Sequence, residues 1–221
     1  MFNFYEETQR IINIISKGAN KAPTMKRIAE IELNKYKQSK KRKKMLTGIN
    51  YYDGKHEILK KKRLAIEEGG QASEQHYLPN SKIINNQYRK AVDQKSNFLC
   101  GRPIAIDTDN DKYTDELNKI FDENFHAILK QTAKNALNCG ISWLYPYIND
   151  RGEFSVKIFS GIEILPFWQD EEHRYIDMAC RLYVIPTYEG ENEKDVEHVD
   201  IFLPEGIEYY IYENGKLVID S

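Results

Sequence analysis

Residues 79–106 read PNSKIINNQYRKAVDQKSNFLCGRPIAI and carry the clearest helix signal in the chain. Residues with apolar side chains or stems recur there at helical spacing: Ile84, Tyr88, Ala91, Val92, Lys95, Phe98 and Leu99. A repeat of 3.6 residues brings these positions to one face, which predicts an amphipathic core helix beginning near Ile83. Cys100-Gly101 ends it, because glycine suits the backbone conformation of a helix C-terminus. A short extended run follows at 103–106.

Further helices are predicted on both sides of this stretch. Isoleucines cluster at 11–15, and helical spacing of apolar residues resumes over 25–36. Downstream, one helix is expected around 117–121 and another over 128–137, where Gly140 ends it. The first two thirds of the chain therefore indicate a predominantly helical region.

The pattern changes to strands from Ile141 onwards. Short segments with apolar alternation lie at 141–149, 154–159, 175–184, 199–203, 207–212 and 217–219. Turns separate several of them, including Asp150-Arg151-Gly152 and Asn214-Gly215, and Asn-Gly is the strongest short hairpin signal. These features predict an α+β fold in which N-terminal helices precede a mostly antiparallel β-meander.

Three regions are expected along the chain. Residues 1–66 form a helical, basic N-terminal region in which Asn50–Gly54 is a turn, and residues 67–80 form a mobile loop because 67–79 are polar and rich in glycine. Residues 81–221 form the α+β core. The sequence stops at Ser221 directly after a predicted strand, so we expect a truncated chain that belongs to a longer protein.

Composition restricts the class of protein. The chain has 221 residues, of which 30% are charged, and it contains no run of about 20 apolar residues that would cross a bilayer. Glu6, Glu7 and Arg10 interrupt the region where a signal peptide needs an apolar core, so a cytoplasmic protein without a membrane partner is expected. The three cysteines lack C-x-x-C spacing, and we expect them to be reduced and buried.

Charge is distributed unevenly. Residues 26–63 contain fourteen Lys/Arg and four Asp/Glu, a net of +10, whereas residues 150–221 contain six and seventeen, a net of −11. Such asymmetry indicates a partner, either an acidic polymer or a second copy that meets the first head to tail.

The candidates for partner or DNA contacts lie in two basic runs. They are Lys40, Lys41, Arg42, Lys43, Lys44, Lys60, Lys61, Lys62 and Arg63. Clustered cations displace counterions from a polyanion, so the runs would suit nucleic acid. No aromatic stacking platform accompanies them, which favours solvated surfaces that pair with acids of a neighbouring subunit.

Patterns that would indicate catalysis or a bound cofactor are incomplete. Asp107, Asp109 and Asp111 have the spacing of a calcium loop, but Lys112 and Asn118 occupy its glycine and closing-glutamate positions, so a solvated loop that caps the next helix is expected. His56-Glu57 lacks the second histidine of a zinc protease, and Glu153 with Lys157 only loosely resembles a nuclease grouping. Phosphate-loop, dinucleotide and serine-elbow motifs do not occur, and we expect neither an enzyme nor a metal or other cofactor.

Three stretches taken in order resemble the portal proteins of long-tailed phages of Gram-positive bacteria. They are NYYDGKHEILKKKR at 50–63, the helix and extended run at 79–106, and ALNCGISWLYPYINDRG from Ala136 followed by EILP at 163–166. The resemblance covers about residues 45–220, and its middle stretch is the most specific.

The resemblance implies a structural role. Portal subunits form a ring, usually of twelve copies, at one capsid vertex, through which the terminase motor packages double-stranded DNA and which connects to head-completion proteins. The expected location is the virion, with assembly in the host cytoplasm. This chain would correspond to the wing, the outer α/β body of the ring, and would end before the stem and clip. The alternative left open is a basic nucleic-acid-binding adaptor that acts alone.

Overall fold

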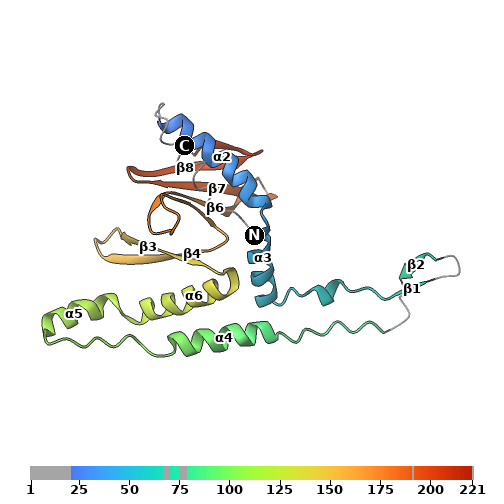
Figure 1. Cartoon of the computed structure of the whole chain (residues 1–221), viewed down its shortest axis with the longest axis horizontal. Coiled ribbons are helices and arrows are strands. Elements are labelled where there is room, and N and C mark those ends of the chain that lie inside the picture. The colour runs from blue at the N-terminus through green and yellow to red at the C-terminus, as the bar shows by residue number, and fades with distance from the viewer. Residues whose placement is uncertain (1–20, 67–69, 75–78, 191, 221) are drawn as a thin grey trace. The chain divides into compact units, whose positions relative to one another are not determined.

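The computed structural model describes residues 21–66, 70–74, 79–190 and 192–220 (Figure 1). Its helices are α2 (Lys21–Gln38), α3 (Lys40–Tyr52), the 3-10 helix η1 (Glu57–Lys60), α4 (Gln87–Cys100), α5 (Asp111–Ile120) and α6 (Glu123–Cys139). Its strands are β1 (Leu64–Ile66), β2 (Ala72–Glu74), β3 (Ser142–Ile148), β4 (Phe154–Ser160), β5 (Ile164–Trp168), β6 (Ile176–Glu189), β7 (Asn192–Leu203), β8 (Gly206–Glu213) and β9 (Lys216–Ile219). This is the predicted α+β class. The predicted helix at 11–15 lies outside the described residues.

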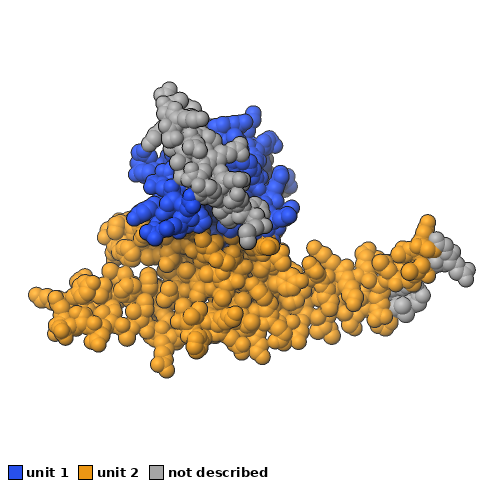
Figure 2. Space-filling model, in the orientation of Figure 1, with its two compact units in different colours: residues 1–43, 159–221 blue, residues 44–158 orange. Residues whose placement is uncertain are grey.

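The elements group into two compact units (Figure 2). The first combines α2 and the start of α3 with residues from Phe159 onwards, and the second comprises 44–158. This grouping differs from the contiguous regions expected from the sequence, because an N-terminal helix packs on a C-terminal sheet. Sequence periodicity indicates helices and strands but not which distant elements share a core.

The first unit is a five-stranded antiparallel meander in the order β5-β6-β7-β8-β9, with α2 on one face. Its core contains Ile28, Ala29, Leu33, Phe167, Met178, Cys180, Leu182, Val199, Ile201, Tyr210, Tyr212 and Leu217. Strand periodicity of two places Cys180, Leu182 and their partners on the same side of the sheet. The predicted meander is confirmed, and β5 is an additional strand that was not predicted from the sequence.

Polar side chains of α2 fasten the helix to the sheet. Glu30 accepts the backbone N–H of Leu217 at 3.1 Å, and Asn34 accepts the Tyr212 hydroxyl at 2.6 Å. Burial opposes ionisation of Glu30, but the Leu217 N–H and the Arg27 guanidinium outweigh it and hold the pKa of Glu30 below its ordinary value. The carboxylate therefore stays charged where it accepts the hydrogen bond from the edge strand β9.

In the second unit α4 packs against α6, and two separate strand pairs, β1–β2 and β3–β4, complete the unit. Asn110 and Asp122 cap α5 and α6 by accepting backbone N–H groups, and Gly140 ends α6 at a φ of 78°. Both predicted helices and the glycine stop are confirmed. The expected helix cap in the 107–111 loop is thus Asn110 and not an aspartate.

Two local predictions need correction. The turn placed at Asn50–Gly54 is shorter, because α3 continues to Tyr52 and only Asp53-Gly54 turns. Within the predicted mobile loop at 67–80, residues Ala72–Glu74 form a strand that pairs with β1, since backbone pairing needs no apolar side chain. Residues 67–69 and 75–78 of that loop lie outside the described part.

The buried face of α4 also differs from the prediction. Val92, Ser96 and Cys100 are buried, whereas Phe98 is 90% exposed and Leu99 68%. Ala91 and Lys95 are exposed as well. The prediction assumed that the largest apolar side chains face inward, but α6 packs on a face that contains a serine and a cysteine.

The cysteines are as expected. Cys100, Cys139 and Cys180 are free and buried. Complete burial raises the pKa of the Cys180 thiol, because the thiolate would lose its hydration. Cys180 is therefore a small apolar core residue of the sheet.

Candidate assembly surfaces

The motif NYYDGKH at 50–56 forms the end of α3 and the start of an outgoing segment in the second unit. Asn86 caps α4 by accepting the Arg89 N–H, and its amide donates to the carbonyls of Tyr51 and Tyr52 at 2.9 and 3.1 Å. His56 stacks on Tyr51 with 4.8 Å between ring centroids, and a ring nitrogen lies 3.0 Å from the Tyr51 carbonyl. His56 thus has a structural role and fixes where the chain leaves α3.

A charged network joins α3, α4 and α6 next to this motif. The Tyr52 hydroxyl donates to Asp93 at 2.9 Å, and the Lys134 ammonium lies 2.8 Å from the same carboxylate oxygen. The Lys134 hydrogen bond, aided by Tyr52 and Arg89 against partial burial, holds the pKa of Asp93 below its ordinary value. This network was not predicted from the sequence, because its members lie about 40 residues apart and share no local pattern.

Asp93→Asn is expected to lower the unfolding free energy at pH 7 by roughly 1–2 kcal/mol, because a hydrogen-bonded charge pair is lost. A carboxyl whose folded pKa is depressed stabilises above its unfolded pKa, near 4, and loses that contribution as pH falls through the lower folded value. Wild-type stability should therefore decline between about pH 5 and pH 3 more steeply than that of Asp93→Asn. Denaturant titrations at several pH values measure this, and parallel pH profiles would contradict the role of Asp93.

The second basic run lies on an extended segment that we call the basic arm, residues 57–66. It contains η1, the cations Lys60, Lys61, Lys62 and Arg63, and β1, which pairs with β2. Lys62 binds Glu74 across that hairpin at 2.7 Å. All four cations are exposed, so the arm presents positive charge to solvent.

The first basic run occupies the first turns of α3. Lys40, Lys41, Lys43 and Lys44 are exposed. Arg42 is half-buried, and its guanidinium lies 5.9 Å from the Tyr36 ring centroid. Arg42 therefore contributes to packing in the first unit, and the four lysines form the solvent-facing part of the run.

The outer face of α4 is an exposed apolar surface. Phe98 and Leu99 border an open hollow of about 510 Å³ that is also lined by Gln94, Lys95 and Leu137. Isolated exposed apolar residues are common, but a phenylalanine 90% exposed beside a leucine 68% exposed is typical of a contact surface. This face of α4 is a candidate assembly surface.

Replacement of Phe98 and Val92 by alanine should separate this surface from the core. Phe98→Ala is expected to change the unfolding free energy by less than about 0.5 kcal/mol, because the ring is already in solvent. Val92→Ala should cost roughly 2 kcal/mol, because its side chain is buried against α6. Thermal or denaturant unfolding of the two variants measures the difference. A larger loss of unfolding free energy for Phe98→Ala than for Val92→Ala would show that Phe98 belongs to the core.

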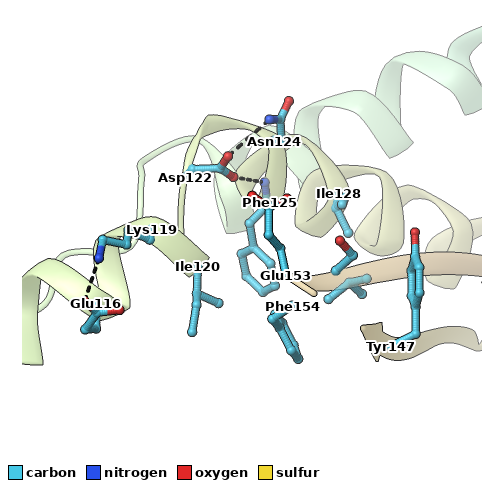
Figure 3. Close-up of a pocket in the computed structure, with 12 residues that line it drawn as sticks. Glu116, Lys119, Ile120, Asp122, Asn124, Phe125, Ile128, Tyr147, Glu153 and Phe154 are labelled. Carbon is cyan, nitrogen blue, oxygen red and sulfur yellow. Dashed lines mark hydrogen bonds and ion pairs between the residues drawn. The ribbon is translucent and has the colours of Figure 1, made fainter. Parts of the chain in front are cut away.

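A larger hollow of about 790 Å³ lies among α5, α6, β3 and β4 (Figure 3). Ile120, Phe125 and Phe154 are among the apolar residues that line it. Several of its polar groups form structural bonds: Asp122 caps α6 at 2.8 Å from the Phe125 nitrogen, and Lys119 binds Glu116 (Figure 3). The capping and ion-pairing groups at its rim thus have structural roles.

The patterns that loosely resembled catalytic sites have structural roles. Glu153 accepts the Asn149 amide in the β3–β4 turn, and the Lys157 ammonium lies 5.2 Å from the Tyr147 ring centroid. Among the described residues no group of three or more His, Cys, Asp or Glu side chains is arranged to hold a metal ion. None of the described helices is long and apolar enough to cross a membrane.

Strands β6 and β7 are both longer than predicted, so the surface formed by their additional residues was not predicted. Expected over 175–184 and 199–203, they run over Ile176–Glu189 and Asn192–Leu203. Pro186 and the many acids beyond it weaken the strand signal in sequence. Val184 and Tyr188 are apolar and evenly spaced, which places them on one face of a strand. This spacing is the sequence signal that would have extended β6.

Comparison with known proteins identifies the family. The family described as phage portal protein, SPP1 Gp6-like, matches residues 32–217, which include elements of both units. The portal protein of Bacillus phage SPP1 is 28% identical over 176 residues, covering 80% of this chain and 34% of the relative. The portal protein of Clostridium phage phiCD119 is 27% identical over 155 residues, covering 65% of this chain and 33% of the relative.

The chain spans about one third of the length of these curated relatives. The match nevertheless extends from α2 to β9 and so includes the NYYDGKH motif, the Tyr52–Asp93–Lys134 network and the candidate surfaces of both units. The chain belongs to the SPP1 Gp6-like family of phage portal proteins.

Proposed function

We propose that this chain is the wing, the outer α/β body, of a portal subunit that assembles into a ring at one vertex of a phage capsid. The family match over residues 32–217 carries the proposal. The exposed α4 face and the basic arm support it, because exposed apolar and charged surfaces of this kind are suited to burial between subunits. The role is structural, and polar clusters such as the Tyr52–Asp93–Lys134 network and the Asp122 cap serve packing and capping.

The partners follow from the same proposal. They are further portal subunits in a ring, usually of twelve copies in the family, together with the terminase motor, capsid and head-completion proteins, and the double-stranded DNA that passes through the channel. The complex would belong to the virion after assembly in the host cytoplasm. We propose the two basic runs as contacts with a neighbouring subunit or with DNA, and a subunit contact is favoured because no aromatic stacking platform accompanies the charges.

Native mass spectrometry of the complete protein, produced from its full open reading frame, tests the proposal. A closed ring of many identical subunits is the expected result, because a portal subunit forms head-to-tail contacts that return to the first copy. A monomer at micromolar concentration that binds duplex DNA with a steep dependence on salt would instead indicate the stand-alone adaptor.

A further inference from the structure

The β6–β7 hairpin extends beyond its neighbours in the sheet. β5 pairs with β6 only as far as Arg181, and β8 pairs with β7 only as far as His198. β6 and β7 themselves remain paired up to Glu189 and Asn192. The two strands therefore continue as a two-stranded ribbon, whose described residues 184–188 and 192–197 we call the acidic ribbon.

One face of the acidic ribbon combines apolar and acidic side chains. The register places Val184 opposite Glu197, Pro186 opposite Asp195 and Tyr188 opposite Glu193. These pairs have the same strand parity as the buried pair formed by Leu182 and Val199. The core face of the sheet thus continues along the ribbon, with an acid across from each apolar residue.

Helix α2 covers the core face only up to the start of the acidic ribbon. Lys37, one residue before the end of α2, binds Glu197 at 2.5 Å. Beyond that contact Val184 is 50% exposed and Tyr188 is 72% exposed. Glu193 and Asp195 are exposed too. The ribbon therefore presents an uncovered sheet face with negative charge.

The basic arm has the complementary composition. Leu64 is 61% exposed and Ile66 is 80% exposed. They follow the exposed cations Lys60, Lys61 and Arg63. Arm and ribbon each combine exposed apolar side chains with exposed charge, and their net charges are of opposite sign.

We propose that the basic arm of one subunit docks on the acidic ribbon of the next subunit in the ring. The inference rests on the proposed function and names the surfaces that meet. A second copy is the fitting occupant, because each copy carries both surfaces. Opposite charges favour contact of an arm with a ribbon over contact between two arms or two ribbons. A contact between two different surfaces is heterologous, and such contacts generate rings. Apolar burial of Leu64, Ile66 and Tyr188 provides stabilisation that salt does not screen.

Charge reversal in the complete protein tests the proposal. Lys61→Glu with Arg63→Glu in the arm, and Glu193→Lys with Asp195→Lys in the ribbon, should each weaken ring formation at least about tenfold, because like charges then meet. Combining all four changes should restore assembly, since the charges become opposite again. Sedimentation velocity over a concentration series measures the effect. The matched control, Lys112→Glu with Glu171→Lys, changes exposed charges outside both surfaces and should assemble like the wild type.

Cysteine pairing gives a second, independent readout. Leu64→Cys and Tyr188→Cys, placed in separately tagged copies and mixed under oxidising conditions, should form a disulfide between the two tags, and neither variant alone should do so. If the wild type forms a ring, both charge-reversed variants form it equally well and no mixed disulfide appears, this inference is overturned and the proposed function stands. A wild-type protein that stays monomeric would overturn both.

Discussion

Leu33→Asp is expected to prevent the first unit from folding. Leu33 is completely buried in α2, where it belongs to the same core cluster as Met178 and Val199. An unpaired carboxylate there would either remain charged without hydration or take up a proton, and in both cases several kcal/mol are lost. Leu33→Ala alone should cost about 3–5 kcal/mol through the lost transfer energy and the cavity. The free energy of unfolding of a single domain is only about 5–15 kcal/mol, so the aspartate should remove most or all of it.

The matched control is Ile31→Asp, two residues away on the same helix, where the side chain is 40% exposed. Near-ultraviolet circular dichroism and denaturant unfolding of both variants measure the result. The aspartate at position 33 should abolish the cooperative transition of the first unit, whereas the aspartate at position 31 should leave it close to that of the wild type. Equal transitions for the two variants would show that α2 does not cover the sheet.

Gly48→Val is expected to destabilise the second unit by at least about 3 kcal/mol, because overpacking against backbone cannot be relieved by a side-chain rotation. A Cβ atom at position 48 would lie 2.1 Å from the carbonyl oxygen of Asn138 in α6. Real contacts never approach so closely, so α3 and α6 would have to move apart. The Tyr52–Asp93–Lys134 network spans the same helices and would be strained with them.

Hydrogen exchange of α6 in Gly48→Val and in Leu46→Ala provides the test. Leu46 lies two residues away in α3 and is 44% exposed, so its truncation should leave the protection of α6 unchanged. Gly48→Val should accelerate exchange throughout α6. Unchanged protection in Gly48→Val would contradict the close crossing of the two helices.

The sequence was informative wherever a local pattern determines structure. Periodicity predicted α4, α5 and α6, although α4 begins at Gln87 and not near Ile83. Stops such as Gly140 were predictable because they act on their own helix. The meander was predictable for the same reason, since Asn214-Gly215 joins two neighbouring strands. β5 was missed because it has only five residues, one of which is Pro166.

The candidate surfaces were predictable only in part. The basic runs are visible as consecutive cations, but the face of α4 depends on α6, which packs on Ser96 and not on Phe98. Apolarity alone assigned Phe98 to the core, although an exposed phenylalanine suits a subunit contact equally well. The acidic ribbon depends on strand register, which places Tyr188 opposite Glu193, and no spacing within one strand reveals it.

Cryo-electron microscopy of particles of the complete protein tests whether this chain forms the wing of a portal ring. We expect a closed ring in which residues 32–217 of each subunit form the outer body with the α2–meander and α4–α6 units described above. Density of a neighbouring subunit should lie on the acidic ribbon. Particles without rotational symmetry, or a ring in which residues 32–217 adopt another fold, would contradict the assignment of this chain as a portal wing.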